Sequence, residues 1–381
     1  MPPIKNKSRN GRSCEKENDT NGYSTPRRLP RKNSPYEAPA RIPLEVKKNG
    51  GNSYSDKGRW VGSGFPGHSH QKQLDEWKKV YKRRQPHLSR DSYRYNLLEM
   101  GKSVCRIKVL HGCTGTGFML IERFILTSAH LFKDCVGEGL KLHKEVFVHF
   151  NCNDPETNTN CSYSFTRIAL VIIDFELDYA ILELNPDSQT PIQQANTENL
   201  KVPPGLLKKI GPPPKSGKAC LLGHPGEDGR RMDCIVIISK EFRKQCVDDL
   251  LDRYHDKIIT FLSVKQILTN QGIQDIMIGG KRADEVVTYK SSSYYGSSGS
   301  PVFDTHGQVF GLHTRGYIYE NLGGPKSVIE YALILLNIIE KIVRNLKASG
   351  NKKLLERIEE VAKENPYIKN ILHPEEPMEI N

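Results

Sequence analysis

From residue 104 onward, the chain is a succession of short apolar or β-branched runs, most of them separated by segments that contain Gly, Pro, Asn or Asp. Such evenly spaced short runs are typical of the strands of a β-barrel or β-sandwich. The runs cover residues 105–110, 117–120, 124–128, 146–150, 168–173, 179–184, 219–223, 234–239, 261–264, 301–303 and 309–314. Residues 185–217 contain seven prolines and separate the runs into two groups. The sequence therefore predicts two β units joined by a Pro-rich connection.

The segments before and after these β units differ from them in composition and in the spacing of apolar residues. Residues 1–70 are polar and poor in aliphatic side chains, which predicts a disordered basic arm. Apolar residues at helical spacing within 71–84 predict an amphipathic helical segment over 71–100. This segment is expected to dock either on the body of the same chain or on a second copy, and the second case would make a homodimer. The same spacing predicts a helix over 327–346, after barrels at about 101–185 and 218–325. Helical insertions are expected at 240–257 and within a charged tail at 347–381.

The net charge of +12 is confined to the N-terminal part of the chain. Residues 1–100 contain 22 Lys and Arg against 10 Asp and Glu, whereas residues 101–381 contain 34 of each. A neutral body with a basic arm indicates that the arm meets DNA, an acidic chromatin partner or an import receptor. A solvated charged arm without a partner is the plainer alternative.

The nine cysteines are scattered and include no Cys-x-x-Cys pair. The N-terminus lacks the apolar stretch of a secretory signal, so we expect reduced thiols and a nuclear location, with the cytoplasm as a second site, rather than secretion. No Cys or His spacing suits zinc, so neither a metal nor a cofactor is expected. The longest apolar runs are too short to span a membrane, so no membrane partner is expected.

Three local motifs carry candidate chemistry. They are Thr-Ser-Ala-His ending at His130, Asp-Tyr-Ala-Ile-Leu beginning at Asp178, and Gly-Ser-Ser-Gly-Ser-Pro with Ser298 as its third residue. Acyl transfer from an amide needs a hydroxyl, an imidazole that takes its proton, and a carboxylate that orients the imidazole. These motifs therefore nominate Ser298 as nucleophile, His130 as general base and Asp178 as the orienting group.

The glycine-rich motif also suggests an oxyanion hole. Glycines allow a turn tight enough for the amides of Gly296 and Ser298 to point together at a developing oxyanion. Each motif has a plainer interpretation as a loop or a packed histidine, but their order and strand contexts favour catalysis. The rival hypothesis is a protease-like scaffold that binds a partner through the basic arm.

The motifs resemble the chymotrypsin-like serine proteases over about residues 104–346. That resemblance implies a mainly β double barrel with the site between the barrels, C-terminal helices, and endopeptidase activity on protein substrates. Residues 212–226, 298–304 and 311–314 are similar to the intracellular, largely nuclear trypsin-like proteases named as a "family with sequence similarity". Those proteases are associated with DNA replication, clearance of proteins trapped on DNA and restriction of viral replication.

The substrate pocket is expected around Ser292, His313, Thr314 and Arg315. Trypsin-like relatives carry Asp six residues before the nucleophile, where this chain has Ser292, so the resemblance disfavours Lys or Arg before the scissile bond. An uncharged floor suits aromatic or Leu side chains. His313 stands where Glu- or Gln-cleaving relatives have a histidine, and this alternative stays open beside a purely structural role.

Overall fold

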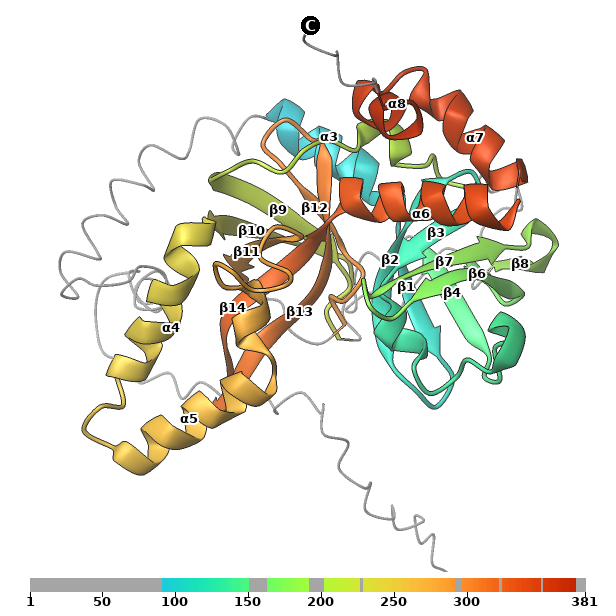
Figure 1. Ribbon diagram of the computed structural model, residues 1–381. Helices are drawn as coiled ribbons and strands as arrows, with labels where there is room; N and C mark the ends of the chain where they lie inside the picture. The colour runs from blue at the N-terminus through green and yellow to red at the C-terminus, as the bar shows by residue number, and fades with distance from the viewer. Residues whose placement is uncertain are drawn as a thin grey trace, which may run out of the picture. The chain divides into compact units, whose positions relative to one another are not determined.

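The computed structural model describes residues 91–150, 163–191, 202–226, 229–291, 296–321, 324–350 and 352–374. The arm at 1–70 and the first part of the segment at 71–100 lie outside the described residues. The described strands form two β units, an open sheet and a closed barrel, with helices packed around them (Figure 1). The fold is therefore mainly β and of the chymotrypsin-like class that the strand pattern and the resemblance predicted, with the first of the two expected barrels left open as a sheet.

The first unit is an eight-stranded sheet in the order β6-β7-β3-β2-β1-β4-β5-β8. Every neighbouring pair in it is antiparallel. Its strands are β1 (Val104–Val109), β2 (Thr114–Ile121), β3 (Phe124–Thr127), β4 (Val146–Phe150), β5 (Tyr163–Phe165), β6 (Ile168–Asp174), β7 (Tyr179–Leu184) and β8 (Gln189–Pro191). The order brings β3 beside β7, so the ends of these two strands, which are far apart in sequence, become neighbours.

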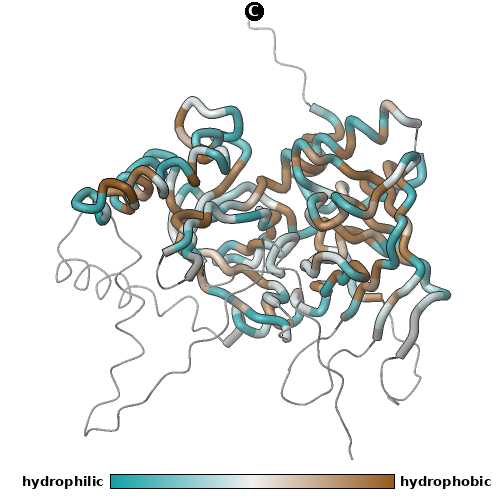
Figure 2. The backbone as a smooth tube through the Cα atoms, turned by 90° about the horizontal axis from the view of Figure 1, so that it is seen from below, coloured by the Kyte–Doolittle hydropathy of each residue, from teal (hydrophilic) through white to brown (hydrophobic). Residues whose placement is uncertain are grey.

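The second unit is a closed barrel in the order β10-β11-β14-β13-β12-β9. Its strands are β9 (Gly217–Gly223), β10 (Arg231–Ile238), β11 (Val286–Lys290), β12 (Pro301–Phe303), β13 (Val309–Asn321) and β14 (Gly324–Ile334). Closure pairs every strand on both sides, which leaves the barrel without a free edge. Apolar residues run along the strands of both units in Figure 2 and form their buried cores.

Six α-helices accompany the barrels in the described part of the chain. They are α3 (Asp91–Gly101), α4 (Arg243–Asp252), α5 (Ile258–Asn270), α6 (Leu335–Ser349), α7 (Lys352–Ala362) and α8 (Pro366–Leu372). Asn365 caps α8 by accepting from the amides of Tyr367 and Ile368. Its own amide group donates to the carbonyl of Ile210 at 2.8 Å. This buried asparagine therefore ties the C-terminal helices to the connection between the two β units.

Two sequence predictions are wrong in this part of the fold. The run at 261–264 lies inside α5 rather than in a strand. The helix predicted over 327–346 begins only at Leu335, because residues up to Ile334 form β14 and pair with β13 and β11. The first part of the apolar stripe falls in β14. There, pairing with β11 and β13 closes the barrel, and this pairing outweighs the local preference for a helix.

Candidate active site

His130 lies in the short 3-10 helix Ala129–Phe132, directly after β3. Its neighbours Ala129, Leu131 and Phe132 are buried, and Leu131 packs against Gly115, where an added Cβ would lie 2.3 Å from the leucine side chain. The imidazole keeps 38% of its surface exposed. The buried neighbours therefore hold the 3-10 helix in place, while the imidazole ring stays accessible to a substrate.

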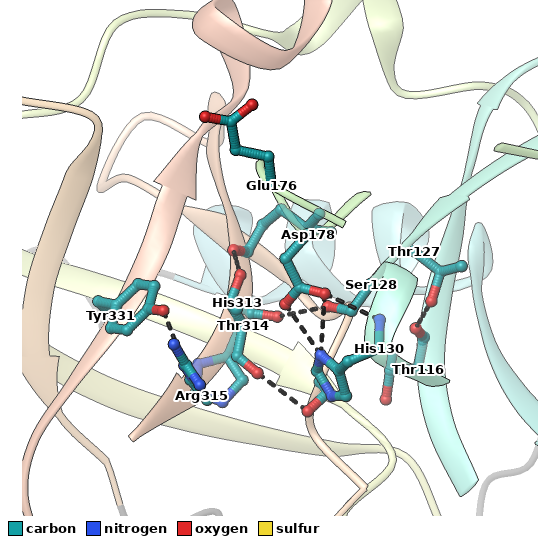
Figure 3. A network of polar contacts seen from close by, with 12 residues as sticks. Thr116, Thr127, Ser128, His130, Glu176, Asp178, His313, Thr314, Arg315 and Tyr331 are labelled. Atoms are coloured by element: carbon teal, nitrogen blue, oxygen red, sulfur yellow. Dashed lines mark hydrogen bonds and ion pairs between the residues drawn. The ribbon is translucent and has the colours of Figure 1, made fainter. Parts of the chain in front are cut away.

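Asp178 lies just before β7 and faces His130 (Figure 3). Nδ1 of His130 is 2.8 Å from Oδ2 and 3.0 Å from Oδ1 of the carboxylate. The backbone amide of His130 also donates to Oδ1 at 2.8 Å. Asp178 has a left-handed φ of 48°, a costly conformation for a residue with a side chain, and such strain gathers at functional sites.

The turn that carries Ser298 requires glycine at two positions. Gly296 has φ +88°, and a Cβ there would lie 2.6 Å from the backbone of His224 and Gly226. Gly299 has φ +89°, and a Cβ there would lie 1.9 Å from the carbonyl oxygen of Thr116. Both the backbone conformation and the space therefore exclude larger residues.

Thr116 on β2 holds this turn from the first sheet. Its hydroxyl donates to the carbonyl of Gly296 at 2.8 Å, and its amide donates to the carbonyl of Ser298 at 2.8 Å. Its own carbonyl accepts from the hydroxyl of Thr127, three residues before His130, at 2.7 Å. A single residue thus connects the segment before His130 with the turn around Ser298.

The hydroxyl of Ser298 donates to the carbonyl oxygen of Thr314 at 3.0 Å. Among the described residues it makes no hydrogen bond with His130. Catalytic hydrogen bonds are commonly long or misaligned without substrate and tighten in the complex. The structure therefore brings Ser298 to the strand beside His130 but leaves its hydroxyl turned to Thr314.

The amides of the Ser298 turn fall into two groups. The amide of Gly299 donates to the carbonyl of His313 at 2.7 Å, and that of Ser300 donates to Ser297 at 3.0 Å. The amides of Gly296, Ser297 and Ser298 have no hydrogen-bond partner within the described part of the chain. The two amides nominated for the oxyanion hole are thus among the three that remain available to an incoming oxygen.

The predicted pocket residues have different surroundings and partners. Ser292 lies outside the described residues. His313 is 3% exposed, and its Nδ1 is 2.6 Å from the hydroxyl of Tyr289. Thr314 is buried and offers its carbonyl to Ser298. Arg315 donates from Nε to the hydroxyl of Tyr331 at 2.9 Å (Figure 3).

Burial governs the protonation of His313. Desolvation, followed by the nearby charge of His130, lowers the pKa of His313 to about 3. A buried imidazole with this pKa is neutral at physiological pH. It therefore cannot supply a positive charge to a substrate carboxylate.

Sequence reasoning missed three residues beside the site: Thr116, Tyr289 and Glu330. Glu330 accepts a hydrogen bond from Ser291, the residue before Ser292, and pairs with Gly316 across the β13–β14 ladder. Burial raises the pKa of Glu330 to about 7, although the hydroxyls of Ser291 and Ser327 oppose that rise. Thr116 lies in the Gly-Thr-Gly segment at residues 115–117, which belongs to the first motif, whereas Tyr289 and Glu330 belong to no local motif and reach the site only through the strand register.

Within the described ranges, His, Cys, Asp and Glu form no group of three or more that could hold a metal ion. The helices of those same ranges are too short or too polar to cross a membrane.

Comparisons with known proteins agree with the motifs. The family model of the trypsin-like peptidase domain matches residues 115–312. The mouse serine protease FAM111A is 29% identical over 234 residues, which is 60% of this chain and 36% of that protein. The human serine protease FAM111B is 29% identical over 219 residues, covering 55% of this chain and 27% of that protein. The matched part of the chain thus spans about a third of these relatives or less.

Solved structures resemble the chain more weakly. The crystal structure of Deg5 covers 65% of this chain at 15% identity with a TM-score of 0.40. A likeness of this degree carries no further argument. The family and curated matches confirm the resemblance inferred from the motifs.

Proposed function

Because the chain belongs to the trypsin-like peptidase family, we propose that it is a serine endopeptidase that cleaves proteins through an acyl-enzyme formed on Ser298. The observation that carries the proposal is the His130–Asp178 contact placed beside a glycine turn that presents Ser298. A scaffold that only binds partners has no chemical need for a carboxylate on Nδ1 of a half-exposed histidine. The geometry therefore favours catalysis over the scaffold hypothesis.

Each group then has one task. Ser298 Oγ attacks the scissile carbonyl while Nε2 of His130 takes its proton and later gives it to the leaving amine. Asp178 accepts from Nδ1–H, keeps Nε2 free to act as base, and stabilises the imidazolium. The amides of Gly296 and Ser298 donate to the oxyanion. Water, activated by His130 in the same way, releases the acyl group.

The primary pocket is proposed to lie beside the strand of His313, Thr314 and Arg315. The neutral, buried His313 favours aromatic or Leu residues before the scissile bond over Glu or Gln. Glu330 accepts a hydrogen bond from Ser291, but with a pKa of about 7 it does not present a full charge at neutral pH. We therefore expect Lys and Arg to be poor residues at this position.

The test is hydrolysis of matched peptides that differ only in the residue before the scissile bond. The expected ranking places Phe, Tyr and Leu first, with Ser298→Ala as the inactive control. Fastest cleavage after Lys or Arg would show that Glu330 supplies a full negative charge and would overturn the apolar pocket. A folded wild-type protein that cleaves no member of the set and no unfolded protein substrate would favour the scaffold function.

The substrates are proposed to be nuclear or chromatin-bound proteins, reached through the basic arm. The support is the confinement of the excess positive charge to residues 1–100, together with the resemblance to nuclear proteases. Deleting residues 1–70 should weaken DNA binding and nuclear accumulation while leaving cleavage of short peptides within about twofold, because the site lies in the barrels. A collapse of peptide cleavage would show that the arm belongs to the catalytic fold.

A further inference from the structure

The backbone of His313 joins the two segments that carry the catalytic groups. Its carbonyl oxygen accepts from the amide of Gly299 at 2.7 Å and from the hydroxyl of Ser128 at 3.4 Å. Its amide donates to the carbonyl of Ser300 at 2.8 Å. The position of this one residue therefore sets the position of the turn around Ser298 and of the residue that precedes the His130 helix.

The side chain of His313 is held from inside the barrel by Tyr289. Nδ1 lies 2.6 Å from the phenolic oxygen, and the two rings are 5.9 Å apart at a tilt of 36°. Tyr289 is fully buried, and burial raises its pKa well above the usual value, so the hydroxyl keeps its proton. With its proton kept, the hydroxyl can donate to Nδ1, and in that arrangement the neutral imidazole carries its own proton on Nε2.

The bond between Tyr289 and His313 crosses the barrel sheet. Tyr289 belongs to β11 and His313 to β13, and β14 lies between these strands in the barrel order. A hydrogen bond between non-neighbouring strands adds a constraint that the strand ladders do not supply. This constraint acts on His313, the residue of β13 whose backbone is hydrogen-bonded to the Ser298 turn.

We propose that the Tyr289–His313 pair is a positioning element for the nucleophile and that the His313 imidazole does not recognise the substrate side chain. The inference rests on the proposed serine-protease function and deepens it. The pair would hold β13 so that Ser298 and the free amides of its turn keep the geometry needed for attack. Small displacements of such groups cost much of the rate of an otherwise intact site.

The primary measurement is the rate at which a small fluorophosphonate labels Ser298 in the full chain. This probe reports nucleophile geometry without filling a specificity pocket. Tyr289→Phe, which removes only the hydroxyl, should slow labelling by about tenfold, and His313→Leu by about a hundredfold. His313→Asn, whose side-chain oxygen can still accept from Tyr289, should recover part of the loss. With peptides, Tyr289→Phe should lower kcat and leave KM within about twofold.

The matched control is Tyr93→Phe. Tyr93 is another buried tyrosine, and among the described residues its hydroxyl makes one hydrogen bond, to the carbonyl of Asp304 at 2.9 Å, beyond the β12 end that carries the Ser298 turn. This variant should lower the melting temperature about as much as Tyr289→Phe but label at the wild-type rate. If Tyr289→Phe also labels at the wild-type rate, the pair only stabilises the fold and the inference fails.

The peptides that differ before the scissile bond test the substrate-recognition alternative. The ranking of Phe, Leu, Gln and Glu should be the same in His313→Leu as in the wild type, with all rates reduced. A selective loss of Gln or Glu cleavage with unchanged labelling would make His313 a pocket residue and overturn the inference. Absence of labelling in the folded wild type would instead remove the proposed function itself.

Discussion

In the first sheet, His130 and Asp178 bond directly through their side chains, whereas in the closed barrel Ser298 is held mainly by bonds of the main chain. The carboxylate lies 2.8 Å from Nδ1 of the imidazole. The Ser298 turn instead depends on two left-handed glycines and on amide and carbonyl contacts to β2 and β13. A conservative substitution of either side chain can therefore disrupt the pair in the sheet. The turn in the barrel is instead sensitive to added side-chain atoms at its glycines.

The largest expected effect comes from Ser298→Ala. The substitution removes the attacking hydroxyl and its bond to Thr314 but no main-chain contact of the turn. Peptide hydrolysis should fall by about 10³- to 10⁶-fold, while circular dichroism and thermal unfolding stay close to the wild type. Turnover near the wild-type rate would remove Ser298 from the mechanism.

Asp178→Asn tests the side-chain pair of the first sheet. The amide would favour the wrong imidazole tautomer, so kcat should fall by about 10⁴-fold with the fold retained. The matched control is Asp174→Asn, because the Asp174 carboxylate accepts from the amides of Glu176 and Leu177 and not from His130. If the Asp174 variant were inactive and the Asp178 variant active, Asp174 would be the partner of His130.

Gly299→Ala tests the backbone shape of the barrel side. A Cβ would overlap the carbonyl oxygen of Thr116 and strain a left-handed backbone, so we expect a loss of more than about 2 kcal/mol in unfolding free energy together with lost activity. Gly139→Ala is the control, because Gly139 also has a left-handed φ, of 68°, but open space around its Cβ position. It should cost only about 1 kcal/mol and leave activity unchanged. Equal losses in denaturant titrations would show that backbone strain alone explains the requirement.

A smaller effect concerns the pH dependence of stability, through one buried histidine in each unit. Burial, with Arg106 as the next cause, lowers the pKa of His149 in β4 to about 4 and that of His224 after β9 to about 3. The unfolded chain binds protons near pH 6.5, so each histidine adds stability above that pH and loses it as the pH falls towards its folded pKa. His149→Gln and His224→Gln should each make the decline in unfolding free energy between pH 6.5 and 4.5 shallower, by up to about 1.4 kcal/mol per pH unit. Unchanged slopes would mean that these histidines are already charged in the folded state.

The sequence motifs predicted candidate catalytic groups that lie within a few residues of a strand end. His130 and Asp178 lie at the ends of β3 and β7, and strands β4, β7 and β12 have the predicted bounds. These signals are local, because a buried strand and the turn after it are specified by neighbouring residues.

Other features depend on contacts between distant segments. Tyr289 meets His313 only because β14 separates their strands by one place in the barrel, and no spacing in the chain reveals this. Residues 327–334 have a helix-like apolar pattern but pair on both sides as β14. The burial of His313 is likewise a property of the closed barrel, so its protonation state could not be predicted from its place in a motif.

The most direct test of the central claim is mass-spectrometric mapping of the adduct that a fluorophosphonate forms with the full chain. We expect one covalent adduct, on Ser298, that is lost in Ser298→Ala and nearly lost in His130→Ala while both variants remain folded. An adduct on a different residue, or a folded wild-type protein that forms none, would contradict the assignment of this site.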